Sequence, residues 1–102
     1  MIHVVAMITA KPGQRDALLA AFAANLPAVR AEEGCIEYGA AVDTDVLGRF
    51  QAMLGPDSLV VIEKWVSGEA LKAHAAAPHM AAFAATTKEM IASRAIHVLS
   101  PA

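Results

Sequence analysis

The order in which strand-like and helix-like hydrophobic patterns follow one another constrains the fold of this chain more than any other feature of its sequence. Residues 2–9 are a short run rich in Ile and Val that ends at Lys-Pro-Gly, as a strand before a turn does. Apolar residues then recur at helical spacing, which predicts an amphipathic helix over residues 15–30. Pro27 must kink that helix or mark its last turn, because proline lacks the N–H donor.

The second half of the chain returns to strand patterns and then to a helix. Residues 35–42 alternate like a strand after Gly34, and residues 49–54 and 59–66 flank Gly-Pro-Asp-Ser, which predicts a hairpin. Ser67 is suited to cap a helix that runs to about residue 76. Further expected elements are a helical piece from Pro78 to about residue 89 and a last strand at residues 96–99. This order predicts an α+β, split βαβ fold with helices on one face of an antiparallel sheet.

Length and composition predict one small domain that associates with a second copy of itself. A chain of 102 residues without repeats or linkers buries one core, so residues 1–102 should form a single domain. Because 24 residues are alanine and only 5% are aromatic, that core is thin. An apolar sheet face without helices would be an association surface, which favours a homodimer.

Charge and hydropathy exclude two classes of partner. The net charge is −2, and the eight Lys and Arg residues form no basic stripe, so we expect no nucleic-acid partner. The longest apolar stretch, residues 17–24, is far shorter than the roughly 20 residues that span a bilayer, so we expect no membrane partner. The start of the sequence lacks a charged leader, and the single Cys35 cannot form an internal disulfide. Both observations favour a cytoplasmic protein.

Glu63 and Trp65 are two residues apart on a predicted strand and must project to the same face. Val60, Ile62 and Val66 project oppositely, and we expect them to pack under the helices. Glu63 and Trp65 would then lie on the face without helices. A buried carboxylate is costly unless it is partnered, so this pair is a candidate site. The alternative is structural, with Trp65 as a core or dimer anchor and Glu63 in a salt bridge.

The four histidines have both structural and functional interpretations. His74 and His79 are five residues apart, about 140° of rotation on one ideal helix, whereas helical zinc pairs use a spacing of four. No neighbouring cysteine or aspartate completes a ligand set, so we predict no metal site. Each of the two is either a packing or capping residue or part of a cavity wall. His3 and His97 lie on the first and last strands and should form a structural cross-strand pair.

Three segments resemble the antibiotic biosynthesis monooxygenase family, in particular its bacterial quinol monooxygenase branch. They are EEGCIEY at residues 32–38, GPDSLVVIEKWVS at residues 55–67 and LKAHAAAPHM at residues 71–80. The resemblance implies a ferredoxin-like fold whose sheets pair into a dimeric α+β barrel, with a pocket between the sheet and its helices. It also implies oxidation of phenolic or quinol substrates by dioxygen without a metal or flavin.

Such chemistry needs only a base and a dry pocket, because a deprotonated quinol can itself pass an electron to dioxygen. We expect His74 to be the base, with His79 as second choice, since the pKa of histidine lies near working pH. Glu63 could orient a histidine or the substrate hydroxyl. The rings of Trp65 and Tyr38 would hold a flat substrate, and we expect Met7 and Phe83 to complete the pocket wall.

Two other functions were weighed against this one. Haem-degrading enzymes of the same superfamily carry an asparagine on the first strand and use a tryptophan and a histidine on the later helices. Those places fall at about Ala6, His74 and Ala84 here, so we expect no haem and no other cofactor. The long polar connection at residues 43–49 also departs from many family members and alters one wall of the pocket. The second function is a non-catalytic dimeric module that binds a small aromatic ligand such as a quinone.

Overall fold

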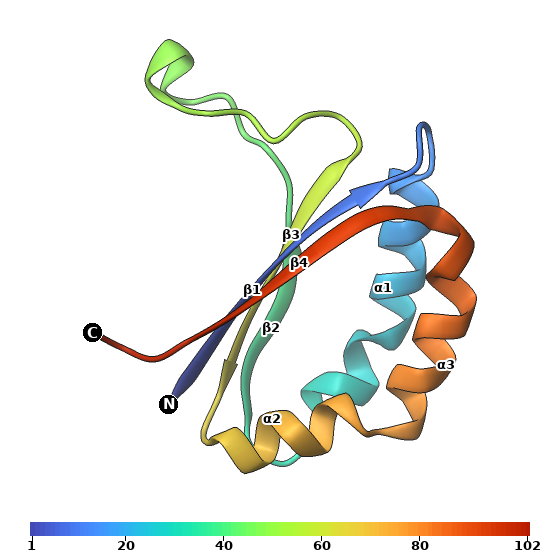
Figure 1. Ribbon diagram of the computed structural model, residues 1–102, viewed down its shortest axis with the longest axis vertical. Helices are drawn as coiled ribbons and strands as arrows, with labels where there is room; N and C mark the ends of the chain where they lie inside the picture. Colours follow the sequence, from blue (N-terminus) through green and yellow to red (C-terminus); the bar gives the residue numbers. More distant parts are fainter.

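A computed structural model describes all 102 residues, which form one four-stranded sheet with three α-helices on one side of it (Figure 1). None of the helices is both long enough and apolar enough to cross a membrane. The elements in chain order are β1 (Ile2–Ala10), α1 (Arg15–Arg30), β2 (Cys35–Ala41), the short 3-10 helix η1 (Gly48–Phe50), β3 (Ser58–Trp65), α2 (Gly68–Ala75), α3 (Pro78–Thr87), the 3-10 helix η2 (Lys88–Met90) and β4 (Ile91–Leu99).

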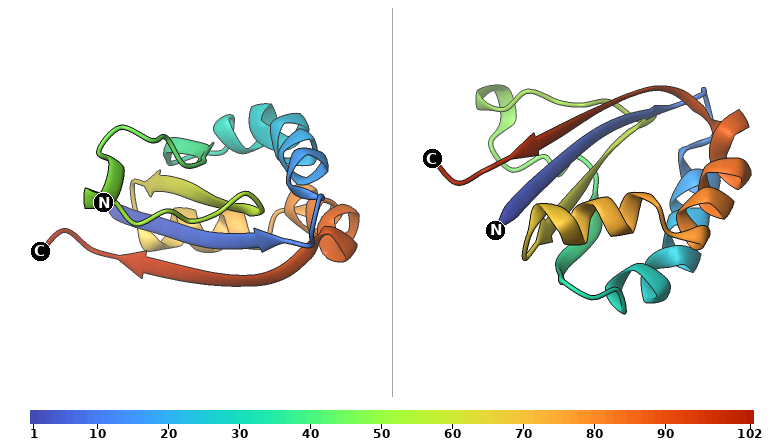
Figure 2. Two further views of the ribbon diagram at one scale, coloured as in Figure 1. Left: turned by 90° about the horizontal axis from the view of Figure 1, so that it is seen from above. Right: turned by 60° about the horizontal axis from the view of Figure 1, so that its bottom comes forward.

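Local sequence signals determine the helix ends. The Ser67 hydroxyl accepts a hydrogen bond from the Ala70 N–H at 3.2 Å and so caps α2, as predicted. Pro78 begins α3, where its missing N–H leaves no helical bond unmade. Pro27 lies in the last turn of α1. Because Pro78 starts a new helix, α2 and α3 meet at a sharp bend (Figure 2).

The sheet has the strand order β2-β3-β1-β4, and every neighbouring pair is antiparallel. The chain therefore crosses over from β1 through α1 to the far edge of the sheet, returns to the centre in β3, and crosses through α2 and α3 to the other edge. This is the split βαβ arrangement predicted above. β4 begins at Ile91, five residues earlier than expected, and pairs along nearly the whole of β1.

The prediction for the two faces of β3 is wrong. Glu63 and Trp65 face the helices and are buried, together with Leu59 and Val61. Ile62 lies on the opposite face and is 40% exposed. Both faces of this strand carry apolar residues, so alternation alone could not tell which one the helices cover. The whole indole ring of Trp65 is removed from solvent on the helix side, which favours this orientation by burying the larger apolar area.

The core lies between the helix-facing side of the sheet and α1. Its ten buried members are mostly small or medium-sized, as the alanine content predicted; they are Val4, Ala6, Ala10, Leu18, Phe22, Val29, Tyr38, Leu59, Val61 and Trp65. Trp65 is the largest of them and has no exposed surface. A core of this size depends on a few large side chains, and two of those, Trp65 and Tyr38, are candidate site residues.

The predicted strand at residues 49–54 does not form. β3 pairs with β2 instead, and residues 42–57 are a long connection that projects away from the sheet (Figure 1). The Asp43 carboxylate accepts hydrogen bonds from the N–H groups of Leu54 and Gly55 at 2.9 Å, which lowers the pKa of Asp43. Side-chain bonds of this kind offer the backbone an alternative to a sheet ladder.

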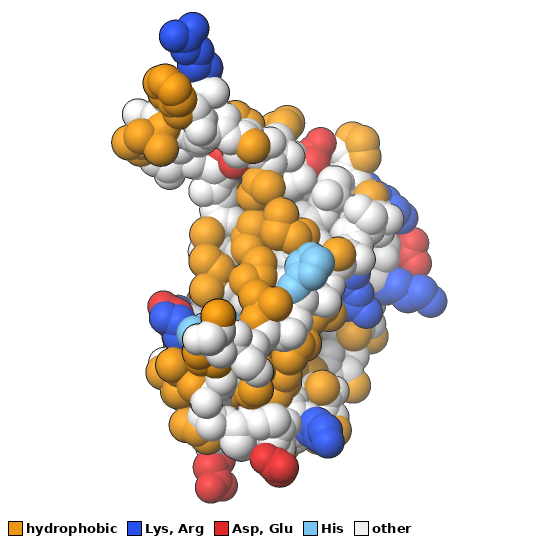
Figure 3. Space-filling view, turned by 60° about the vertical axis from the view of Figure 1, so that its left-hand side comes forward, with side chains coloured by type: hydrophobic (Ala, Val, Ile, Leu, Met, Phe, Trp, Pro, Cys, Tyr) orange, Lys and Arg blue, Asp and Glu red, His pale blue; other side chains and the backbone are white.

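The face of the sheet away from the helices has no covering element. Val5 lies beside Ile62, and Met7 lies beside Val60, so apolar side chains form a continuous row across the two central strands. Figure 3 shows hydrophobic side chains gathered over the strands on this side. We call these four residues the open face.

Gly34 provides a test of how closely α2 approaches the turn before β2. Its φ is +85°, and a Cβ here would lie 2.6 Å from the Cβ of Ala70 and 2.8 Å from Cγ2 of Val66. Gly13 has a φ of +76° but no atom within 4 Å of such a Cβ. Gly13→Ala should therefore cost about 1–2 kcal/mol of unfolding free energy for the backbone alone. Gly34→Ala should cost a further 1–3 kcal/mol or so for the clash, measured by urea unfolding. Equal losses in the two variants would contradict this packing.

Candidate active site

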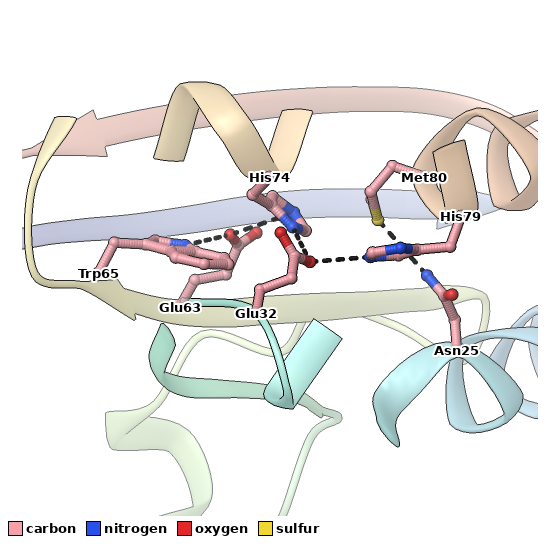
Figure 4. A network of polar contacts seen from close by, with 7 residues as sticks. All are labelled: Asn25, Glu32, Glu63, Trp65, His74, His79 and Met80. Atoms are coloured by element: carbon pink, nitrogen blue, oxygen red, sulfur yellow. Dashed lines mark hydrogen bonds and ion pairs between the residues drawn. The ribbon is translucent and has the colours of Figure 1, made fainter. Parts of the chain in front are cut away.

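Four ionisable side chains from four separate segments meet at the end of the sheet nearest α2 (Figure 4). Glu32 comes from the turn between α1 and β2, Glu63 from β3, His74 from the last turn of α2, and His79 from the first turn of α3. Their side-chain exposure is 14% for Glu32, 9% for Glu63, 6% for His74 and 29% for His79. His79 is thus the member of the group that solvent reaches most easily.

Glu32 holds the two histidines together. Its Oε2 lies 2.8 Å from Nδ1 of His74 and 2.9 Å from Nε2 of His79. A carboxylate oxygen accepts hydrogen bonds, so we assign a hydrogen to each of these ring nitrogens. The two rings therefore point at one oxygen atom, although their residues belong to different helices.

The tautomer of His74 follows from this contact. With its hydrogen on Nδ1, neutral His74 has a free lone pair on Nε2. Nε2 points toward the side of the site formed by β3, where Oε1 of Glu63 is 3.9 Å away. A histidine whose one nitrogen donates to a carboxylate and whose other nitrogen is free has the arrangement of a general base.

Glu63 is a buried carboxylate whose pKa is raised. Trp65 donates a hydrogen bond from Nε1 to Oε1 of Glu63 at 2.9 Å. This bond offsets part of the free-energy cost of burying the carboxylate. Burial raises the pKa of Glu63, while the Trp65 hydrogen bond and nearby His74 oppose that rise. A buried carboxylate with a raised pKa beside a histidine is typical of a functional site more than of an ordinary core.

Aromatic rings enclose His74 on two sides. Its ring centroid lies 4.6 Å from that of Trp65 and 5.4 Å from that of Tyr38. Tyr38 in turn stacks on Phe22 with a centroid distance of 5.3 Å. Burial first, and then the carboxylates of Glu63 and Glu32, raise the pKa of Tyr38, so its phenol does not act as a base near neutral pH.

The space between the sheet and the helices, where a pocket was expected, is filled by these side chains. Trp65, Tyr38 and His74 are all buried there. Two open grooves are each lined in part by one residue of the site, Tyr38 or His79. One of about 320 Å³ is lined by Arg30, Cys35, Ile36, Glu37 and Tyr38. Another of about 250 Å³ lies between α1 and α3 and is lined by Ala21, Ala24, Asn25, His79, Ala82, Phe83 and Thr86.

The structure brings together five of the seven residues selected from the sequence: His74, His79, Glu63, Trp65 and Tyr38. The side chains of His74 and His79 would diverge only if both residues belonged to one continuous helix. The break before Pro78 turns the second ring back toward the first.

The other two residues lie elsewhere. Phe83 packs edge-on against Phe22, with centroids 6.3 Å apart, and lines the groove between α1 and α3. Met7 belongs to the open face, on the opposite side of the sheet from Trp65, so its assignment to the pocket wall is wrong. It pairs with Val60, and the error follows from the inverted faces of β3.

Two further expectations concern residues outside the site. β1 and β4 are neighbours, as expected, but His3 pairs with Leu99 and His97 with Val5, so the two histidines are diagonal and not directly opposite. Cys35 begins β2 and is only partly buried, and burial raises the pKa of its thiol.

Glu32 was not among the residues predicted from the sequence. It is followed by Glu33, and nothing local distinguishes the two, since both precede the turn at Gly34. The available signal was the turn itself: Gly34 has a positive φ, and its carbonyl accepts a hydrogen bond from the Val66 N–H at 2.9 Å, which brings this turn against the start of α2. A turn docked against a helix that carries a histidine is a place to look for that histidine's partner.

The chain is similar to known proteins over most of its length. The model of the family described as antibiotic biosynthesis monooxygenase matches residues 1–86. A relative from Escherichia coli (strain K12), named probable quinol monooxygenase YgiN, is 42% identical over 103 residues. That alignment covers 99% of this chain and 98% of the relative.

Solved structures share the fold over almost the whole chain. PA3566 from Pseudomonas aeruginosa has a TM-score of 0.82 at 26% identity, covering 99% of this chain and 93% of that one. Rv0793 from Mycobacterium tuberculosis has a TM-score of 0.81 at 29% identity, with coverages of 99% and 94%. The predicted ferredoxin-like architecture is therefore confirmed.

The raised pKa of Glu63 predicts how stability depends on pH. A carboxyl group that holds its proton more tightly when folded stabilises the fold below its unfolded pKa, ordinarily 4.5, and loses that contribution as pH rises through the folded pKa. Glu63→Gln keeps an oxygen for the Trp65 hydrogen bond but carries no charge. The variant should therefore be more stable than the wild type near pH 8, with a difference that shrinks toward about pH 4.

The measurement is the urea midpoint of both proteins across that pH range. Glu37→Gln is the matched control, because Glu37 is half-exposed and paired with Lys64 at 3.2 Å on the protein surface. It should change stability by less than about 1 kcal/mol at every pH. If the stability of Glu63→Gln relative to the wild type increases as the pH falls, the pKa of Glu63 is not raised in the folded protein.

Proposed function

This chain belongs to the antibiotic biosynthesis monooxygenase family, and from that premise and the geometry of its site we propose that it oxidises quinols or related polyphenols with dioxygen. No metal or flavin takes part in the proposed reaction. The name of the 42% identical relative supports the quinol substrate class. The observation that carries the proposal is the Glu32 carboxylate that orients His74 and leaves its Nε2 free among aromatic rings.

In water at neutral pH, oxidation of a quinol by dioxygen is slow because no base removes the phenolic proton. A phenolic hydroxyl has a pKa of about 10, so at neutral pH only about one quinol molecule in a thousand is the reactive anion. In our proposal Nε2 of His74 takes the phenolic proton, and Glu32 stabilises the imidazolium that results. A positioned base of this kind contributes on the order of 10² to 10⁴ in rate.

The quinolate then supplies the electrons. It passes one electron to dioxygen, which forms a semiquinone and superoxide. Transfer of the second electron with two protons gives quinone and hydrogen peroxide. Recombination of the radicals instead forms a carbon–oxygen bond, and loss of water gives a hydroxyquinone. Each route consumes one dioxygen per quinol, and its atoms and electrons balance. No cofactor is needed, because the substrate is the reductant.

The proton that Nε2 of His74 takes from the quinol returns from the same nitrogen to the reduced oxygen, because the overall reaction neither releases nor consumes a proton. Oε2 of Glu32 touches both histidines, at 2.8 and 2.9 Å, and side-chain exposure rises from 6% at His74 to 29% at His79. In this proposal Nδ1–H of His74 and Nε2–H of His79 both stay hydrogen-bonded to Glu32 throughout the cycle, so Nε2 of His74 is free again after each turnover.

The substrate enters, in our proposal, from the groove beside Tyr38. That residue lines the groove of about 320 Å³, and its ring is 5.4 Å from the ring of His74. Movement of this one ring would connect the groove with the base. Trp65 and Tyr38 would then lie on either side of a flat substrate, while Glu63 accepts a hydrogen bond from its second hydroxyl.

The functional unit is proposed to be a homodimer joined through the open face. The row formed by Val5, Met7, Val60 and Ile62 is apolar and has no covering element within the chain. A second copy presents the same row, so a two-fold contact would cover both. The family resemblance implies the same pairing of sheets into a barrel.

His74→Asn tests the base. The asparagine amide can still donate to Glu32 but cannot accept the phenolic proton, so the fold is retained while the chemistry is lost. Oxygen uptake with an active hydroquinone at pH 7 should fall at least about a hundredfold. The deficit should narrow as the pH approaches about 10, where the quinol ionises by itself. Lys72→Asn, at an exposed position on the same helix α2, is the matched control and should keep full activity.

The same assay separates the alternatives. Catalase returns half of the consumed oxygen if hydrogen peroxide is the product, and none if oxygen is inserted into the ring. Loss of activity in His79→Asn but not in His74→Asn would make His79 the base. A protein that binds quinones saturably, without oxygen uptake above the uncatalysed rate for any hydroquinone, would be the non-catalytic binding module.

Ile62→Lys tests the dimer. Ile62 lies between Val5 and Gly39 in the middle of the open face, so a charge there would be buried in the contact. Sedimentation velocity at micromolar concentration should show a dimer for the wild type and a monomer for this variant. Ala81→Lys, at an exposed position on α3, should remain dimeric. A monomeric wild type would rule out the proposed assembly.

A further inference from the structure

Glu32, His74 and His79 have the composition of a metal-ligand set, and we propose that they bind one divalent transition-metal ion per chain, of the Zn²⁺ class, that switches the base off. Each residue offers one ligand atom, and these atoms all lie within 4.8 Å of one another. Two imidazoles and one carboxylate are a set that Zn²⁺, Co²⁺ and Fe²⁺ favour, whereas Mg²⁺ and Ca²⁺ prefer oxygen atoms alone.

The three groups need little movement to admit an ion. Oε2 of Glu32 is 2.8 Å from the ligand nitrogen of His74 and 2.9 Å from that of His79. Ligands at about 2.0–2.2 Å from a tetrahedral zinc ion lie roughly 3.3–3.5 Å from each other, so each contact must widen by about 0.5 Å. The three residues come from three different segments. The two ring nitrogens, which lie within 4.8 Å of each other, must come to about the same separation of roughly 3.3–3.5 Å. The fourth position would be left to water.

Groups around the three ligands also suit a cation. A metal-bound histidine usually donates its other N–H to a carboxylate, which orients the ring. Oε1 of Glu63 is 3.9 Å from Nε2 of His74, on the side of the ring away from Glu32. Glu63 and Glu32 together provide two carboxylates near one divalent charge.

An ion can reach the site through the groove between α1 and α3. His79 lines that groove of about 250 Å³ and is the most exposed of the three ligands, at 29% of its side chain. An entry path that ends at a ligand is one of the requirements of a metal site.

Binding would change which nitrogen of His74 carries the hydrogen. Without metal, Nδ1–H donates to Glu32 and Nε2 is free to accept a proton. With a metal on Nδ1, the remaining hydrogen is on Nε2 and faces Glu63, so His74 has no free lone pair. This consequence rests on the proposed function, in which His74 is the base, whereas the binding itself does not.

Calorimetric titration of the metal-free protein with ZnCl₂ tests the site. We expect one ion per chain in the wild type. His79→Ala should weaken binding at least about tenfold, because it removes one of three ligands. Since His79 is partly exposed, this variant should fold, and its thermal melt checks that it does. Glu32→Gln is the second variant and should weaken binding similarly.

His97→Ala and Cys35→Ser are the controls, because an exposed histidine or a free thiol can capture zinc on its own. Both should bind as the wild type does. Absence of saturable binding, binding unchanged in His79→Ala, or binding lost in either control would overturn the site.

Oxygen uptake then distinguishes the two proposals. Zn²⁺ at the concentration that fills the site should inhibit the wild type at least about tenfold. His79→Ala, compared with its own zinc-free rate, should need at least about ten times more Zn²⁺ for the same fractional inhibition. One ion bound per chain without any quinol oxidation would leave the metal site standing and remove the proposed function. Oxidation that continues at full rate with the site filled would overturn the switch.

Discussion

One carboxylate oxygen shared by two imidazole rings is the interaction on which the rest of the site depends. Glu32 accepts from Nδ1 of His74 and Nε2 of His79, and through them ties the turn before β2 to α2 and α3. The contact decides which nitrogen of His74 is free, and therefore whether that ring can act as a base. It also creates a candidate metal-ligand set, so the proposed catalysis and the proposed inhibition share the same three side chains.

The polar site residues lie inside a small core that buries little apolar surface area. Trp65 and Tyr38 are among the few large side chains of the core and are also walls of the site. Burial of Glu63 opposes its ionisation, and only the indole N–H of Trp65 offsets that cost within hydrogen-bond distance. Stability and function therefore compete for the same residues, as is common at sites that hold a buried charge.

Much of the fold could be predicted from local signals, whereas contacts between distant segments could not. Ser67 and Pro78 set helix ends through their own backbone chemistry, and the order of patterns predicted the sheet. The faces of β3 were inverted because both are apolar, and Met7 was misplaced with them. Residues 49–54 look like a strand, yet Asp43 bonds to the backbone beside them. The partner of His74 was missed because Glu32 is 42 positions away in sequence.

His74 lies on α2 and His79 on α3. The angle between these two helices therefore sets the distance between the ring nitrogens of the two histidines. His74 and His79 sit on either side of a two-residue joint, Ala76–Ala77, which belongs to neither helix. Substitutions on the outer surfaces of these helices can rotate one against the other without touching the site. We expect substitutions at such remote positions to change how far each ring nitrogen lies from Glu32, because the angle at Ala76–Ala77 sets both distances.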